Sequence, residues 1–409
     1  MKPRLAVIIP TRNRPDLVRI AIRSVLDQRG EGVRVVVSDN STRAEAVADV
    51  AAFCRGLDGV TCIRPPDPLS MSDHWSWILR QAATGAWGDH IAFLTDRMLL
   101  RAGQLRTLLD IIERHPREIV TYLIDAIRDD LSPIRFNLHA WSGRLVRVEA
   151  DTMLRLLARA EMPLSAPLLL NSVVPVETLA ALQRQHAAIC DSTAPDYCFC
   201  LKLLDVVDSF LFLDKPLLVQ HGMPVSNGLT FTTGRDNDVR RDFLANLPKG
   251  EAFNACAPIP GIPVAVNTAV HEYGLRRKRG GRRVLPPLDL AAYHQQVYRQ
   301  VMMIEDEDQR RRFLSMLPPG TRPPERGSMK PGDHMRKTLR RILWPLCGPV
   351  CRAVWCQAAR RGVQLPGLAW LGFDDPGVAR EIAARFMLRP GFLSVYGQMI
   401  AEVAPLKDA

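Results

Sequence analysis

The sequence predicts an α/β fold in which a mainly parallel sheet is covered by helices on both faces. Short apolar segments alternate with amphipathic helical segments through the first part of the chain, and this alternation is typical of parallel sheets. Three of the apolar segments are followed by polar residues, at Pro10–Asn13, Ser38–Asn40 and Asp96. Ligands bind at the carboxyl ends of the strands in such sheets, so these polar residues mark the expected site.

The strands are expected where apolar and β-branched residues run without a helical period. The expected strands are Leu5–Ile9, Val33–Val37, Val60–Ile63, His90–Leu94, Ile119–Ile124, Phe210–Leu213 and Leu217–Val219. Helices are expected where apolar residues recur at helical spacing, with Pro in the first turn of two of them. The expected helices begin at Pro15, near Met153 and at Pro195, or span Ala44–Phe53, Ser72–Ala83 and Leu105–Ile112.

The chain after about residue 250 has a different pattern, which predicts a mostly helical C-terminal extension. We expect an α/β domain at residues 1–250 and a helical extension at 251–317. A Pro- and Gly-rich segment at 318–332 is typical of a linker. Residues 333–409 form the last expected part, a basic helical region.

The chain carries 54 Lys and Arg against 43 Asp and Glu, a formal net charge of +11. This excess fits an anionic ligand, an anionic membrane surface or nucleic acid. Two segments are strongly basic, Arg276–Arg283 and Arg336–Val363. The second mixes apolar and cationic residues, as membrane-surface segments do, although a solvated face packed on the rest of the protein is the alternative. Aromatic residues make up 6% of the chain, which disfavours nucleic acid as a partner.

The 9 cysteines include no C-x-x-C pair, which indicates reduced thiols in a cytosolic protein. The apolar run before Pro10 is too short for the core of a signal peptide. No segment reaches the length of a membrane-spanning helix. We therefore expect a cytoplasmic protein, with peripheral attachment to the inner face of the membrane as a further possibility.

Three segments together resemble the family 2 glycosyltransferases of the GT-A fold. They are Val7–Arg14 with the following helix that ends at Ser24–Gln28, Val36–Ser41, and Ile91–Arg97. The resemblance covers about residues 5–222 and rests on the three motifs occurring in order. It implies an inverting glycosyltransferase that moves a sugar from a nucleotide diphosphate sugar to a saccharide or lipid-linked acceptor. Such an enzyme would act in surface polysaccharide or glycan synthesis, with residues 1–250 as its nucleotide-sugar-binding and catalytic domain.

The resemblance assigns the nucleotide sugar to the residues at the ends of the first, second and fourth strands. These residues are Pro10, Thr11, Arg12, Asn13, Asp39, Asp96 and Arg97. Asp39 would accept a hydrogen bond from the base, while Thr11 and Asn13 would contact base and ribose. Arg12 could pair with phosphate. The alternative is that these residues only form turns and helix caps.

Asp96 corresponds to the acidic motif that contacts the ribose or a divalent cation in this family. A Mg²⁺ or Mn²⁺ ion held by Asp96 and His221 is one expectation, since hard cations prefer carboxylate oxygens. The usual second acid is absent because Arg97 follows. Arg97 could itself supply positive charge to the leaving diphosphate, and His221 could be a structural loop residue.

Asp196 is the expected general base, because inverting transfer requires an acceptor hydroxyl to lose its proton. Thr193–Tyr197 resembles the helix start where the family carries an acid for this step, and Asp191 is the second candidate. A helix N-terminus lowers the pKa of a carboxylate, so burial would have to oppose that effect. Helix capping by Asp196 is the structural alternative.

Two alternatives to a glycosyltransferase are a degenerate binding protein, which the sequence allows, and a nucleotidyltransferase, which it disfavours. The missing second acid is compatible with a catalytically degenerate GT-A-fold protein that serves as a binding or scaffold protein. A nucleotidyltransferase on a related sheet would carry a Gly-rich basic loop after the first strand, and Pro10–Arg14 contains no Gly.

Overall fold

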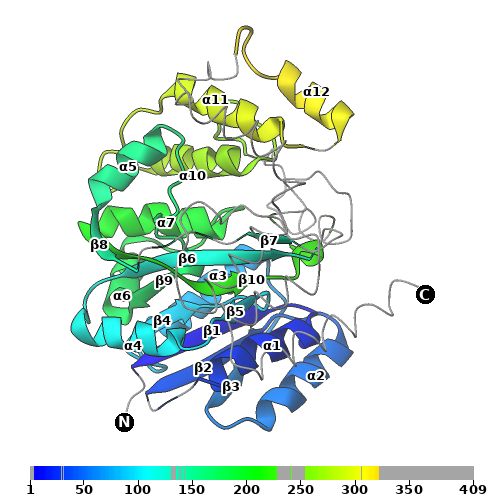
Figure 1. The fold of residues 1–409 in the computed structure, drawn as a ribbon, viewed down its shortest axis with the longest axis vertical. Helices are drawn as coiled ribbons and strands as arrows, with labels where there is room; N and C mark the ends of the chain where they lie inside the picture. The colour runs from blue at the N-terminus through cyan, green and yellow to red at the C-terminus, as the bar shows by residue number, and fades with distance from the viewer. Residues whose placement is uncertain are drawn as a thin grey trace, which may run out of the picture.

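The computed structural model describes residues 4–321, with gaps at 29, 31, 130–134, 138, 140, 142, 227, 229–240, 242–253 and 305. Its centre is a ten-stranded sheet in which eight strands follow the order β3-β2-β1-β4-β9-β6-β10-β5. The remaining two strands lie beside this path, β7 next to β6 and β8 next to β10. Helices lie on both sides of the sheet, and a further group of helices lies beyond one of these layers (Figure 1).

The first four strands form a parallel unit. They are β1 (Leu5–Thr11), β2 (Val33–Asp39), β3 (Val60–Ile63) and β4 (His90–Phe93). The register places Thr11 beside Asp39, so β1 and β2 end side by side. This register brings the first two polar segments together at the carboxyl ends of the parallel strands.

The other strands extend the sheet with both orientations. They are β5 (Met98–Leu100), β6 (Val120–Arg128), β7 (Arg135–Asn137), β8 (Leu145–Glu149), β9 (Ser172–Pro175) and β10 (Ser209–Gln220). β9 is antiparallel to both β4 and β6, whereas β10 is parallel to β6. The sheet is therefore mixed at this side. The sequence predicted short strands between Asp125 and Ala194 without bounds, and β9 is one of them.

Two apolar cores lie on opposite faces of the sheet. One face is covered by α1 (Pro15–Leu26), α2 (Ala44–Arg55) and α4 (Gln104–Arg114). The other is covered by α3 (Met71–Ala82), α5 (Ala150–Ala158), α6 (Val176–Gln185) and α7 (Pro195–Val206). In β1, Leu5, Val7 and Ile9 face the first core while Ala6 and Ile8 face the second. Burial on both faces explains why this strand is continuously apolar.

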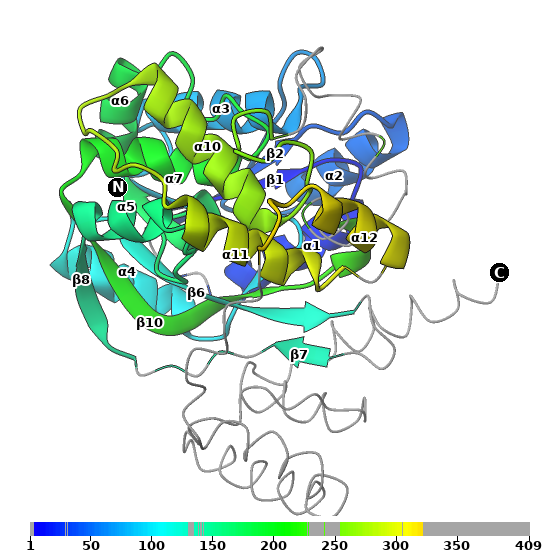
Figure 2. The ribbon, with the colours of Figure 1, turned by 90° about the horizontal axis from the view of Figure 1, so that it is seen from above.

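The C-terminal helices are α10 (Ala265–Arg279), α11 (Leu290–Val301) and α12 (Glu307–Ser315). They share a small core that includes Tyr293 and Val297. Tyr273 of α10 also packs into the core of the α/β part, so α10 joins the two parts. Figures 1 and 2 show α10 and α11 stacked over α7 and α5, on the side away from the sheet.

The expected α/β class with helices on both faces is confirmed, and so is the helical extension over its described residues. The two strands expected at 210–213 and 217–219 are one strand, β10. Its register is irregular around Pro216, which lacks an amide donor for the ladder. The end of the expected linker at 318–332 and the basic region at 333–409 lie outside the described residues, which stop at 321.

Two further expectations concern cysteines and membrane spans. Six cysteines lie within the described residues, and all six are free thiols. Among the helices of residues 4–321 that are described, none combines the length and the apolar character needed to cross a bilayer.

Candidate functional site

Thr11 and Asp96 meet at the carboxyl edge of the sheet. The Thr11 hydroxyl donates a hydrogen bond of 2.9 Å to Asp96 Oδ2. Both side chains are 3% exposed. The amide of Asn40 donates to the carbonyl of Thr11 at 2.9 Å, which draws the end of β2 to the same place. The structure thus brings together the ends of the three strands that the sequence singled out.

Arg14 is the second partner of Asp96. One guanidinium nitrogen lies 3.4 Å from Asp96 Oδ1, and another donates to the carbonyl of Val225 at 2.9 Å. Arg14 is the last residue of the first motif, Val7–Arg14, and no role was predicted for it. Its position at the end of that motif was the available signal, but its pairing with a residue 82 positions away needs the fold.

Asp39 is held in a fixed orientation by two neighbours. Its Oδ1 accepts the Ser41 amide at 2.9 Å, and its Oδ2 accepts Arg64 Nη1 at 3.2 Å. Arg64 also donates to the carbonyl of Ser41 at 2.7 Å. Arg64 follows β3 directly and was not among the predicted site residues. Each carboxylate oxygen of Asp39 retains a further lone pair for a ligand.

Asn13 fastens the loop after β1 to the loop after β2. Its φ is 57°, a left-handed conformation that Asn tolerates better than most residues. Its side-chain oxygen accepts the amides of Thr42 and Arg43 at 2.9 and 3.0 Å. Its side-chain nitrogen donates to the Thr42 hydroxyl at 2.8 Å. These hydrogen bonds agree with the alternative prediction for Asn13, in which it stabilises a turn.

Arg12 and Pro10 also have structural partners. Arg12 Nη1 donates to the carbonyl of Leu69 at 2.8 Å. The side chain of Asn40 donates to the same carbonyl and accepts the amide of Leu69. Pro10 is buried in β1 opposite Ser38. Pro10 therefore shapes the strand end, and Arg12 anchors the segment before α3.

Arg97 and His221 are joined by two hydrogen bonds, one between their backbones and one from the Arg97 side chain to the His221 carbonyl. The His221 amide donates to the Arg97 carbonyl at 2.9 Å, and Arg97 Nη1 donates to the His221 carbonyl at 3.2 Å. Burial lowers the pKa of Arg97 to about 10, although the neighbouring Asp96 and Asp129 act in the opposite direction. Asp129, at the end of β6, accepts the amides of Gly222 and Met223 at 2.7 and 2.8 Å. The loop after β10 is thus fixed against this edge.

The residues expected to hold a divalent cation do not form a matching set of ligands. His221 is 0% exposed, and its ring nitrogens have no hydrogen-bond partner in the part of the chain that the structure describes. Burial and the charge of Arg97 lower its pKa to about 3, so the ring is neutral. Asp96 is engaged by Thr11 and Arg14, and the guanidinium group of Arg97 is a further neighbouring charge.

Two guanidinium groups beside a single carboxylate repel a divalent metal ion electrostatically. Within the described ranges there is also no group of three or more His, Cys, Asp or Glu residues that could hold a metal ion. The described residues therefore fit charge balance by arginine better than a resident Mg²⁺ or Mn²⁺ ion.

Asp196 lies in the first turn of α7, and Ala194 rather than Asp196 is the N-cap. Asp196 Oδ1 accepts the amide of Leu170 at 3.2 Å, within the short helix η1 (Leu169–Asn171). Burial raises the pKa of Asp196 to about 7, against the lowering effect of the Leu170 and Leu169 amides. Burial thus outweighs the lowering effect expected of a helix N-terminus.

The position of η1 places Asp196 at the carboxyl ends of the parallel strands, where Asp96 also lies. β9 is antiparallel to β4, with Val173 opposite Ala92, so the residues before Ser172 continue past the carboxyl end of β4. Leu170 and Leu169 belong to this continuation. The Asp196 carboxylate, which accepts the Leu170 amide, therefore lies at the same end of the strands as Asp96.

Asp191 is less suited to act as a base. Lys202 Nζ donates to its Oδ1 at 2.7 Å and Arg279 to its Oδ2 at 2.8 Å. Burial acts to raise the pKa of Asp191, but the hydrogen bond and charge of Lys202 more than offset this and lower the pKa. A carboxylate between two cations holds a proton weakly, so Asp196 is the better candidate.

The basic segment Arg276–Arg283 packs on the α/β part of the protein. Four of its arginines form ion pairs with aspartates of that part. The pairs are Arg276 with Asp205, Arg279 with Asp191, Arg282 with Asp208, and Arg283 with Asp151 and Asp208. This arrangement agrees with a packed structural role for the segment.

Residues 6–167 match the family described as "Glycosyl transferase family 2". Similar solved structures include S. aureus TarS 1-349 in complex with UDP-GlcNAc, at 11% identity and a TM-score of 0.43, covering 76% of this chain and 72% of that one. S. aureus TarS matches at 13% identity and a TM-score of 0.42, over 75% of this chain and 50% of that one.

A complex of S. aureus TarS 1-349 with UDP matches at 14% identity and a TM-score of 0.41, over 74% of this chain and 83% of that one. The curated proteins gave no match to the sequence. The family match supports a glycosyltransferase that uses a nucleotide sugar. It also confirms, over residues 6–167, that the chain resembles the family 2 glycosyltransferases, as its three strand-end motifs predicted.

Proposed function

We propose that this protein is an inverting glycosyltransferase that moves a sugar from a nucleoside diphosphate sugar to a hydroxyl of a saccharide or lipid-linked acceptor. The observation that carries the proposal is Asp96, held between Thr11 and Arg14, with Thr11 lying opposite Asp39 at the end of β2. Polar groups from three strands meet at the edge where open α/β sheets bind ligands. Surface polysaccharide or glycan synthesis is the process that fits this reaction.

The donor's nucleoside would lie over the ends of β1 and β2. Asp39, oriented by Ser41 and Arg64, would accept an N–H of the base. Asp96 would accept a ribose hydroxyl with the oxygen lone pairs that Thr11 and Arg14 leave available. In this proposal the bonds that Asp39 and Asp96 already make orient both carboxylates before the donor arrives, which reduces the entropic cost of binding.

The diphosphate would be neutralised by Arg14 and Arg97. Guanidinium groups form strong charge-assisted hydrogen bonds with phosphate oxygens, and they stabilise charge that develops on a leaving group. Arg14 bridges Asp96 and the carbonyl of Val225, which fixes its head group at the strand edge. Arg97 is buried, so its charge would act through a medium of low polarity.

Asp196 would accept the proton of the acceptor hydroxyl. As that oxygen forms a bond to the anomeric carbon, the bond from this carbon to the diphosphate oxygen breaks, and the nucleoside diphosphate leaves. Attack opposite the leaving group inverts the anomeric configuration. The pKa of Asp196, raised by burial to about 7, suits a base that works near neutral pH.

The second candidate is a degenerate protein that binds nucleotide sugars without turnover. It is favoured by the single acid at Asp96, which is followed by Arg97. Donor binding without transfer or hydrolysis would distinguish it from the enzyme. Attachment to an anionic membrane surface stays a prediction, because the basic region on which it rests begins at residue 333, outside the described residues. A cytoplasmic location also stays a prediction, which rests on the cysteine pattern and on the short apolar run before Pro10.

The test is a thermal-shift panel with UDP-glucose, UDP-N-acetylglucosamine, GDP-mannose and dTDP-rhamnose, followed by hydrolysis assays with any donor that stabilises the protein. Asp96→Asn should lose most of the stabilisation. Asp110→Asn is the matched control, since Asp110 makes only an exposed pair with Arg106 on α4. If no donor shifts the melting temperature of the wild type, the proposal is wrong.

A further inference from the structure

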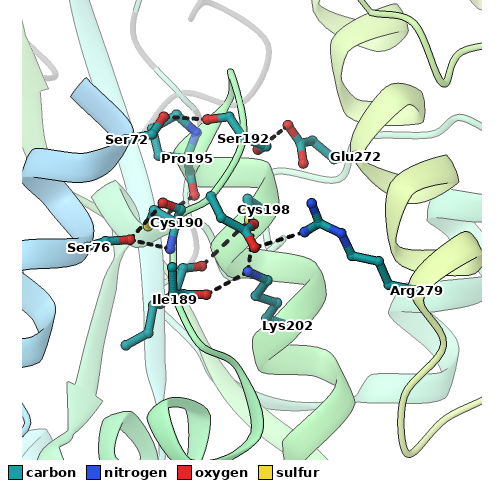
Figure 3. A network of polar contacts seen from close by, with 12 residues as sticks. Ser72, Ser76, Ile189, Cys190, Ser192, Pro195, Cys198, Lys202, Glu272 and Arg279 are labelled. Carbon is teal, nitrogen blue, oxygen red and sulfur yellow. Dashed lines mark hydrogen bonds and ion pairs between the residues drawn. The ribbon is translucent and has the colours of Figure 1, made fainter. Parts of the chain in front are cut away.

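The segment between α6 and α7, residues 189–194, is held on one side by α3. The Ser76 hydroxyl donates to the Cys190 carbonyl at 2.6 Å and accepts the Cys190 amide at 2.8 Å. Ser72, one turn earlier on α3, donates to the carbonyl of Ser192. These contacts, drawn in Figure 3, fix the backbone of the segment against the α/β part of the protein.

Glu272 of α10 holds the same segment on its other side. Glu272 Oε1 accepts the Ser192 hydroxyl at 2.5 Å (Figure 3). It also accepts the Ala194 amide at 3.3 Å. The Glu272 residue is 3% exposed. A buried carboxylate lowers stability unless its oxygens receive hydrogen bonds. Movement of Ser192 or Ala194 away from Glu272 would break these hydrogen bonds and therefore destabilise the protein.

The segment leads directly into the helix that carries the proposed base. Ala194 is the N-cap residue of α7, and Asp196 lies two residues later in its first turn. A shift of the Ala194 backbone therefore moves the start of the helix together with the Asp196 carboxylate. Displacements of about 1 Å at a reacting group can cost on the order of a hundredfold in rate.

We propose that Glu272 is a positioning residue that sets the place of Asp196 by fixing Ser192 and Ala194. The inference rests on the proposed role of Asp196 as general base. It assigns a part in the acceptor side of the reaction to α10, which lies outside the family-matched residues 6–167. The C-terminal helical extension would then be needed for turnover but not for donor binding.

The test compares Glu272→Ala, Glu272→Gln and Ser192→Ala with the wild type in hydrolysis of the donor that gives the largest thermal shift in the panel above. Glu272→Ala should lower kcat about tenfold or more, with the KM for the donor changed by less than about twofold. Glu272→Gln keeps a side-chain oxygen as acceptor and should retain more of kcat. Glu307→Gln on α12 is the control, because Glu307 makes an exposed pair with Arg311.

Ser192→Ala removes the same hydrogen bond without a change in α10, so it keeps the test valid if Glu272→Ala fails to fold. It should also lower kcat with little effect on the donor KM, and the double variant should lose less than the product of the two single effects. Wild-type kcat in a folded Glu272→Ala or Ser192→Ala protein would overturn the inference.

Asp196→Asn is measured beside these variants to separate the two proposals. If Asp196→Asn loses activity while the Glu272 and Ser192 variants keep it, only the positioning role is wrong. If Asp196→Asn retains wild-type kcat, or the wild type neither transfers nor hydrolyses the sugar of any donor, the proposed function fails and the inference fails with it.

Discussion

Thr11 and Asp96 are 85 residues apart in sequence, yet the Thr11 hydroxyl donates a hydrogen bond of 2.9 Å to the Asp96 carboxylate. This bond joins the end of β1 to the residues after β4. Asp96 is also within 3.4 Å of the Arg14 guanidinium group, so a single carboxylate is oriented by two residues from the first motif.

Thr11→Val should weaken donor binding and lower stability. Valine keeps the shape of the side chain but cannot donate to Asp96, which would leave a buried carboxylate oxygen without one partner. We expect a loss of about 1–3 kcal/mol in the free energy of unfolding and about tenfold weaker donor binding. Chemical denaturation and titration calorimetry measure both quantities. Thr152→Val is the control on an exposed helix surface, and an unchanged donor affinity in Thr11→Val would contradict the proposal.

Arg14→Gln should weaken binding of the nucleoside diphosphate, because the neutral side chain cannot balance phosphate charge. Arg14→Lys should recover only part of the affinity, since an ammonium group lacks the planar fork that binds two oxygens at once. The measurement is the dissociation constant for UDP, GDP and dTDP at two salt concentrations. Arg19→Gln is the matched control, because Arg19 pairs with Asp16 and Asp49 on the surface. Equal affinity in all these proteins would remove Arg14 from the donor site.

Asp196→Asn should lower kcat about a hundredfold or more, with donor affinity unchanged, because general bases contribute rate factors of this size. In the wild type, the base must be ionised, so kcat should rise with pH through about 7, where burial places the pKa of Asp196. A pH–rate profile measures this limb, which the Asn variant should lack. A profile with the same limb in both proteins would assign it to another group.

The same pKa shift makes a prediction for stability. The folded protein binds the Asp196 proton more tightly than the unfolded chain, whose carboxyl pKa is near 4, so stability from this group falls as pH rises between about 4 and 7. Asp196→Asn should therefore be more stable than the wild type at pH 8, and this difference should shrink toward pH 4. Melting temperatures across this range measure it. An Asn variant that is less stable at pH 8 would show that the shift is absent.

Chelation should leave donor binding largely intact, since Arg14 and Arg97 supply the positive charge beside Asp96. The thermal shift given by the best donor should be the same within about 1 °C in EDTA and in Mg²⁺ or Mn²⁺, because binding sets its size. A shift that disappears in EDTA and returns with Mn²⁺ would restore the cation at Asp96 and His221.

The strand ends could be predicted because they depend on local pattern. Leu5–Ile9 is continuously apolar, and Thr11, Asp39 and Asp96 each follow such a run. Arg14 and Arg64 could not be assigned from the sequence, because their partners Asp96 and Asp39 lie in other segments. His221 was predicted either to help hold a cation or to be a structural loop residue, and its full burial against Arg97 agrees with the second. Side-chain direction in a loop depends on packing, which no local pattern encodes.

The α/β class, the helical character of the extension over its described residues and the strand-end residues could all be predicted from the sequence, because they depend on periodicity and on the placement of polar residues. The contacts that these residues make came from the packing of the whole chain. It paired Asp96 with Thr11 and Arg14, and it packed Asp196 against η1 so that burial outweighs the helix N-terminus. Hydrogen bonds between distant segments and the desolvation of a carboxylate arise only when the whole chain is packed.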